Sequence, residues 1–275
     1  KEVVQVYYSA PEGKISKEKI SLAAFAKTPL LEPGRSCTLN MTFDIKDMAS
    51  YDDMGDVEKN AYVLETGEYK IFVGTSVRDN VLAYTYNIAE NIIAEKLNSY
   101  CAPVKLEKRL IADGTYRDVP ERTEKMKTFP VVYHNEYKPR DKVIELYDVD
   151  EGKATLDEFI SQMSDEDLML VLCGKPETSV SAGTIGGVFK YRIMPIATAD
   201  GPSGVHLHWQ RGVRPTAFPV PTAIGSSWNT ALAEEIGKAI ALECKENNIQ
   251  VWLGPGMNIH RNPLCGRNFE YYSED

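Results

Sequence analysis

The spacing of apolar residues changes along this chain, and that change limits the folds it can adopt. Across residues 1–90 apolar side chains recur at every second position, which is typical of strands with one buried face. The pattern predicts strands at Val3–Tyr8, Thr38–Phe43, Tyr69–Val73 and Val81–Tyr86. Turn-forming residues such as Pro33-Gly34 and Thr66-Gly67-Glu68 separate these segments. We therefore expect an antiparallel β-sandwich that lacks its first strands.

From residue 154 onward helical and strand-like patterns alternate. Apolar residues fit one helical face at 156–163, and Ser164 followed by three acids predicts the start of a second helix. A strand at 193–199 precedes a helix capped by Asn229 or Thr230, and a further strand follows at 249–253. Strands alternating with helices favour a parallel sheet in residues 154–275.

Residues 91–153 are interpreted as a connector that packs along neighbouring domains. Asn91–Tyr100 is expected to form a short helix, after which several prolines and Asp113-Gly114 interrupt any long element. Apolar residues near position 130 make the segment too hydrophobic for a disordered tether.

Composition excludes several classes of partner. The net charge of −9 argues against binding to a nucleic-acid backbone, and no apolar run is long enough to span a membrane. Five widely spaced cysteines without a CxxC pair, and no visible signal peptide, indicate reduced thiols and a cytoplasmic location. The chain begins at Lys1 within a strand-like pattern, so we expect that something upstream has been removed. A homo-oligomer is possible.

Two polar loops follow predicted strands and are the candidate site. Asp200-Gly-Pro-Ser-Gly204 ends the first strand, and the segment Asn258–Asp275 follows the second. In βα folds the loops at the carboxyl ends of strands carry function. A carboxylate such as Asp200 can accept hydrogen bonds from vicinal hydroxyls, and the fork of Arg267 can bind hydroxyls or a carboxylate. Alternatively, Asp200 is a turn residue and Arg267 forms a structural ion pair with Glu270, Glu274 or Asp275.

Other chemistries have weaker support. The histidines at 206, 208 and 260, with Cys265, lack any matched metal-binding spacing, so no metal ion or cofactor is expected. Ser203 does not lie in a G-x-S-x-G motif. Trp209, Trp228 and Trp252 can stack on a sugar ring, although core positions are commoner for this residue.

Four segments resemble the first part of the catalytic barrel of glycoside hydrolase family 3. They are Asp200–Gly204, Phe218-Pro-Val-Pro-Thr222, Ser227-Trp-Asn229 and Asn258–Asp275. Glu2–Tyr8 and Leu31–Ser36 resemble that family's fibronectin type III-like domain. The resemblance implies a partial fibronectin III-like β-sandwich followed by an incomplete (β/α)8 TIM-type barrel. This order matches the reversed arrangement of some bacterial β-glucosidases.

The resemblance also implies an activity and a substrate. The family hydrolyses terminal β-linked glycosyl residues with retention, so an oligosaccharide or aryl β-glycoside is the expected substrate. Asp200 and Arg267 would bind the sugar on the non-reducing side of the cleaved bond. Glu270, Arg261, His260 and Trp209 are candidates for supporting positions.

The resemblance places both catalytic carboxyl groups outside this chain. The nucleophilic aspartate belongs to a later barrel strand, and the acid/base glutamate belongs to an α/β sandwich domain expected upstream of Lys1. The chain also stops before the family's Lys-His pair. We therefore expect a piece that is inactive alone and needs the α/β sandwich domain and the rest of the barrel as partners. A non-catalytic module that binds sugar or a partner is the alternative.

Overall fold

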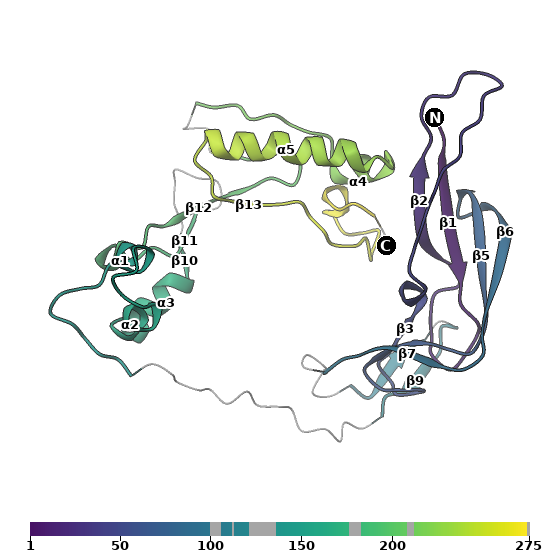
Figure 1. Ribbon diagram of the computed structural model, residues 1–275, viewed down its shortest axis with the longest axis horizontal. Coiled ribbons are helices and arrows are strands. Elements are labelled where there is room, and N and C mark those ends of the chain that lie inside the picture. Colours follow the sequence, from purple (N-terminus) through teal and green to yellow (C-terminus); the bar gives the residue numbers. More distant parts are fainter. Residues whose placement is uncertain (100–105, 112, 121–135, 176–182, 208–211, 274–275) are drawn as a thin grey trace. The chain divides into compact units, whose positions relative to one another are not determined.

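The computed structural model describes residues 1–99, 106–111, 113–120, 136–175, 183–207 and 212–273 (Figure 1). The chain divides into two compact units, Lys1–Pro130 and Val131–Asp275. Within the described residues, no helix combines the length and the apolar character needed to cross a bilayer.

The first unit contains two antiparallel sheets that share a core. One sheet has the order β2-β1-β5-β6, formed by Ser21–Lys27, Val3–Ser9, Gly67–Ser76 and Asp79–Ile88. The other has the order β3-β4-β7, formed by Ser50–Asp52, Ala61–Leu64 and Ile92–Lys96. Leu64 of the smaller sheet packs with Tyr69 and Ile88 of the larger one and with Met48 of the short 3-10 helix Ile45–Met48. Apolar side chains from both sheets thus form one interior.

Two of the predicted elements are wrong. Thr38–Phe43 forms no strand, although Leu39, Met41 and Phe43 are half-buried and the residues between them are exposed. The alternation of apolar and polar residues therefore indicates that one face of this segment is partly buried. A partly buried face does not require that the segment pair with a neighbouring strand. Asn91–Tyr100 contains the strand β7, which pairs with β4, instead of a helix. Pairing with β4 satisfies the backbone of this short β-branched segment, which is too short to be stable as a lone helix.

A buried carboxylate organises the loop after β3. Asp52 is 1% exposed, and its side chain accepts hydrogen bonds from the backbone N–H groups of Gly55, Asp56, Val57 and Glu58 at 2.6–3.0 Å. Burial on its own raises the pKa of Asp52, but these N–H groups stabilise the carboxylate and hold the pKa below its usual value. The carboxylate of Asp52 thus accepts the hydrogen bonds of four consecutive backbone N–H groups in this loop.

A small hairpin attaches to the same loop through charges. It consists of β8 (Lys108–Leu110) and β9 (Tyr116–Asp118), which are antiparallel. The facing residues Arg109 and Arg117 form ion pairs with Asp53 and Asp56 respectively. Three short segments of the predicted connector, namely β7, β8 and β9, thus belong to the β unit.

The second unit combines small helices with a four-stranded sheet. Its helices are α1 (Leu146–Asp150), α2 (Leu156–Ser161), α3 (Asp165–Leu172), α4 (Pro221–Ser226) and α5 (Thr230–Glu246). The strands follow the order β10-β11-β12-β13, namely Gly174–Lys175, Thr184–Ile185, Ile196–Asp200 and Val251–Leu253. Short 3-10 turns lie at Phe189–Tyr191 and Asn268–Glu270.

Local sequence accounts for where these helices begin. The side chains of Ser164 and Asn229 accept hydrogen bonds from the backbone N–H groups of Asp167 and Leu232, as the capping patterns predict. The sheet is parallel only between β12 and β13, whereas β10, β11 and β12 are antiparallel. The expectation of a parallel sheet thus holds for the pair of strands that flanks the helices α4 and α5.

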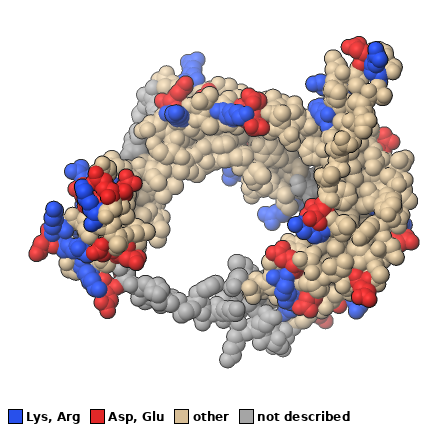
Figure 2. All heavy atoms as spheres, in the orientation of Figure 1, with Lys and Arg blue, Asp and Glu red and all other residues tan. Residues whose placement is uncertain are grey.

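Helix α5 covers the parallel pair (Figure 1). Ile240 and Cys244 of the helix pack with Ala199 of β12 and with Ile249, which directly precedes β13. The opposite face of α5 is charged, and Lys238 pairs there with Glu234 and Glu235. Both signs of charge are visible along this helix in Figure 2. One apolar and one charged face are what an amphipathic helix on a sheet requires.

Candidate functional site

Asp200 is the last residue of β12 and is exposed. It pairs in register with Leu253, the last residue of the parallel strand β13. Both strands therefore end at the same edge of the sheet, and their following loops begin side by side. This is the position at which βα folds place functional groups.

Two glycines form the turn after Asp200. Gly201 and Gly204 have φ values of +130° and +124°, which side chains rarely tolerate. A Cβ on Gly201 would lie 1.7 Å from the carbonyl oxygen of Gly204. The turn is closed by a hydrogen bond of 2.7 Å from the N–H of His206 to the carbonyl of Asp200. The backbone after Asp200 is thus fixed in a conformation that needs glycine.

Trp252 of β13 holds this turn from the neighbouring strand. Its indole Nε1 donates to the carbonyl oxygen of Gly201 at 2.8 Å, and its ring packs on the core beneath α5. Trp252 therefore supports the wall of the site rather than offering a free stacking surface.

We expect Gly201→Ala to lower the free energy of unfolding of this chain by about 3 kcal/mol or more, because the new Cβ meets backbone atoms. Gly237→Ala is the control, since its Cβ meets nothing within 4 Å and it lies inside α5. That change is expected to raise stability by about 1 kcal/mol. Urea unfolding measures both, and equal stability of Gly201→Ala and the wild type would show that the turn tolerates a side chain.

The second loop doubles back on itself after β13. Gly256 forms a parallel bridge with Tyr271, and the N–H of His260 donates to the carbonyl of Ser273 at 2.9 Å. Inside the loop, the side-chain Nδ2 of Asn268 donates to the carbonyl of Asn262 at 2.9 Å. A Cβ on Gly256 would lie 2.6 Å from the carbonyl oxygen of Glu270. The loop is thus a closed, tightly packed structure next to the end of β13.

Arg267 directly precedes the 3-10 turn in this loop, and Glu270 is the last residue of that turn. The side chain of Glu270 is 8% exposed and that of Arg267 is 72% exposed. Nε of Arg267 donates to Oε1 of Glu270, and the hydrogen bond to this carboxylate raises the pKa of Arg267. An arginine carries four further N–H groups on its terminal nitrogens. The buried acid therefore holds one edge of a guanidinium whose other edge is available for an acceptor-rich ligand.

The role of Thr222 was missed from the sequence. The hydroxyl of this α4 residue donates to the carbonyl oxygen of Tyr271 at 2.6 Å. Nε2 of His260 also lies 3.2 Å from that oxygen, so the imidazole must carry its proton on Nε2 to bond there. The position of Thr222 after Pro-Val-Pro gave a weak signal at most, because nothing in the sequence identified a backbone carbonyl as its partner.

The remaining candidates differ in how they are placed. Arg261 is exposed on the second loop, and His260 contributes to loop closure through its backbone and ring. Trp209 and His208 lie outside the described residues, as do Glu274 and Asp275. Among the residues that are described, no three His, Cys, Asp or Glu side chains form a group suited to a metal ion.

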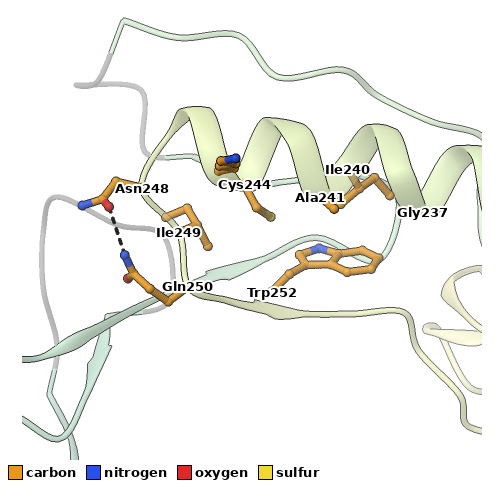
Figure 3. A pocket seen from close by; sticks show the side chains of 9 residues that line it. Gly237, Ile240, Ala241, Cys244, Asn248, Ile249, Gln250 and Trp252 are labelled. Carbon is orange, nitrogen blue, oxygen red and sulfur yellow. Dashed lines mark hydrogen bonds between the residues drawn. The ribbon is translucent and has the colours of Figure 1, made fainter. Parts of the chain in front are cut away.

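A groove of about 450 Å³ runs between α5 and β13 (Figure 3). Ile240, Cys244, Ile249 and Trp252 line it, with a hydrogen bond of 3.0 Å from Gln250 to Asn248 at one end. Gln250 directly precedes β13, whereas Asp200 lies level with the last residue of that strand. The groove is thus a flank of the βα unit and is separate from the loops that carry Asp200 and Arg267.

Several known proteins are similar to this chain. The family model for the fibronectin type III-like domain matches residues 2–77. The chain is 42% identical over 306 residues to β-glucosidase A of Butyrivibrio fibrisolvens, and the match covers 100% of this chain and 36% of that protein. It is 38% identical to a β-glucosidase of Ruminococcus albus, and that match covers 100% of this chain and 30% of the relative. The chain thus resembles β-glucosidases of glycoside hydrolase family 3 over its whole length.

A solved structure extends the similarity to three dimensions. The β-glucosidase of Paenibacillus barengoltzii matches with a TM-score of 0.85 and 39% identity, over 100% of this chain and 32% of that one. The chain thus spans about a third of the length of the curated relatives and of this structure. The two curated relatives that match over the whole chain are both β-glucosidases.

Proposed function

We propose that this chain is the part of a retaining, β-glucosidase-like enzyme that recognises the terminal non-reducing sugar. The observation that carries the proposal is the geometry of two loops. Asp200 is the last residue of β12 and pairs with the last residue of β13. The loop after β13 contains Arg267, which forms an ion pair with the buried Glu270. An exposed carboxylate and an exposed guanidinium, each on a fixed backbone, suit a ligand with several hydroxyl groups.

The two side chains have complementary roles in this proposal. Asp200 accepts hydrogen bonds from neighbouring sugar hydroxyls, and Arg267 donates to hydroxyl oxygens of the same ring. Charged hydrogen bonds of this kind are shorter and stronger than neutral ones. Contacts to ring hydroxyls that strengthen as the ring approaches an oxocarbenium-like geometry contribute to rate as well as to affinity.

Bond cleavage itself requires groups from other parts of the protein. A retaining mechanism uses two carboxyl groups about 5 Å apart, one as nucleophile and the other as acid and then base. In our proposal neither Asp200 nor Glu270 has these tasks, because Asp200 binds hydroxyls and Glu270 is engaged with Arg267. The remainder of the barrel and an α/β sandwich domain supply the reacting pair.

The fold proposal follows the same lines. The unit β12-α4-α5-β13 is one repeat of a (β/α)8 barrel, supported by the parallel pairing and by the helix that covers it. We propose that the groove between α5 and β13 receives the next repeat of the barrel. Its apolar lining is suited to packing against another helix and strand.

The chain alone is expected to bind glucose weakly and to leave p-nitrophenyl β-glucoside intact. Glucose titration followed by NMR of the arginine Nε–H signals measures binding, with Arg267→Lys to assign the signal and mannitol as a matched non-cyclic polyol. Release of p-nitrophenol by purified chain, lost in Asp200→Ala, would overturn the assignment of the reacting carboxyl groups to other parts of the protein. Equal responses to glucose and mannitol would argue against a sugar site.

A further inference from the structure

We propose that Thr222 is a positioning residue for the sugar-binding loop: its hydroxyl anchors the turn that carries Arg267 and Glu270 to helix α4. The inference rests on the proposed function for its effect on sugar affinity. Its structural part, the anchoring of the turn, can be measured without any ligand.

The contacts of the hydroxyl carry the proposal. Oγ1 of Thr222 donates to the carbonyl of Tyr271 at 2.6 Å, and the carbonyls of Asn268 and Phe269 lie 3.3 and 3.4 Å away. A 3-10 turn of three residues leaves carbonyls at its end without a partner inside the helix. One hydroxyl therefore lies close to three carbonyls, two from the 3-10 turn and one from Tyr271, which directly follows it.

Helix α4 holds Thr222 in place for this contact. Thr222 follows Pro221, which is buried at the first helical position. The backbone carbonyl of Thr222 accepts a hydrogen bond from Oγ of Ser226 at 2.7 Å. Gly225 lies three residues further on, and a Cβ there would be 3.1 Å from the carbonyl of Tyr272. Residues three apart share a helical face. The face bearing Thr222 and Gly225 is thus in close contact with the backbone of Tyr271–Tyr272.

The same carbonyl receives a second donor from within the loop. Nε2 of His260 lies 3.2 Å from the oxygen of Tyr271, so its two lone pairs are used by α4 and by the loop start. Glu270 directly precedes Tyr271 and is the buried partner of Arg267. Loss of the Thr222 bond therefore loosens the residue next to Glu270, and the exposed guanidinium of Arg267 loses its fixed position.

The test compares Thr222→Val, which keeps the shape and removes the hydroxyl, with Thr222→Ser, which keeps the hydroxyl. Thr230→Val is the control, because Thr230 is an exposed residue at the start of α5. Hydrogen exchange is measured at the amides of Glu270 and Tyr271, which bond to the carbonyls of Arg267 and Asn268. Glucose affinity is measured by titration.

In Thr222→Val we expect both amides to exchange about tenfold faster and the glucose Kd to rise about tenfold, the effect of one lost hydrogen bond. Thr222→Ser and Thr230→Val should resemble the wild type. Wild-type exchange at both amides in Thr222→Val would overturn the proposal, as would equal loss of protection throughout α4 and α5 in the Val and Ser variants. If wild-type chain binds no glucose, the proposed function fails, and the exchange data still decide the role of Thr222.

Discussion

Asp200→Asn, in a longer protein that carries this chain, is expected to lower kcat/KM for p-nitrophenyl β-glucoside by about two to four orders of magnitude. The substitution keeps the size of the side chain and removes its charge. Hydrogen bonds to a charged group contribute about 1.5–3 kcal/mol each, and two such bonds account for this range at about 1.4 kcal/mol per tenfold. The loss should fall mainly on kcat if the contacts strengthen in the transition state.

Arg267→Ala should produce a loss of similar size, because the guanidinium serves the same sugar from the other loop. Asp165→Asn is the matched control, since Asp165 is an exposed acid in the first turn of α3. Steady-state kinetics on folded variants, checked by circular dichroism, measure all three. Wild-type kinetics in Asp200→Asn or Arg267→Ala would reject the assignment of that residue to the substrate.

Asp52→Asn is expected to lower the free energy of unfolding of the β unit by about 3 kcal/mol. The side chain is almost completely buried and accepts from four consecutive backbone amides. In asparagine an NH2 group replaces one of the two acceptor oxygens, so a donor would face these N–H groups. Urea unfolding measures the loss, with Asp113→Asn as the control because Asp113 caps an exposed hairpin turn.

The effect of Asp52→Asn should depend on pH. The pKa of Asp52 in the folded chain lies below its usual value of about 3.9, so its stabilisation is fully present above that value. As the pH falls through the folded pKa, the carboxylate is protonated and the stabilisation is lost. The difference between wild type and variant should therefore be constant near neutrality and shrink below about pH 4. A difference independent of pH down to pH 2 would contradict this account.

The sequence predicted the elements whose pattern and pairing agree. Alternation at Tyr69–Val73 and Val81–Tyr86 corresponds to β5 and β6, which pair with each other along most of their length. At Thr38–Phe43 the same alternation occurs on a segment with no strand partner. Periodicity reports which side chains are buried, and it contains no information about which backbone lies alongside.

In the candidate site, too, some features were predictable from the sequence and others were not. The position of Asp200 at the end of an apolar strand was predictable, because strand patterns and glycine turns are local signals. The role of Thr222 was not, since its partner is a backbone carbonyl 49 residues further along the chain. Every residue presents a carbonyl, so the identity of Tyr271 could not mark it as the acceptor. The substrate contacts of Asp200 and Arg267 remain predictions.

The hairpin β8-β9 is attached to the loop around Asp52 by two arginine–aspartate pairs, and all four side chains keep some contact with water. Electrostatic interactions between such groups are screened over about 8 Å at physiological ionic strength and over shorter distances in concentrated salt. The attachment of the hairpin therefore depends on the surrounding electrolyte, while the sheets beneath it are held by apolar burial. Within one unit, a kosmotropic salt such as sulfate thus has opposite effects on two parts: it weakens the ion pairs that attach the hairpin and strengthens apolar burial in the core.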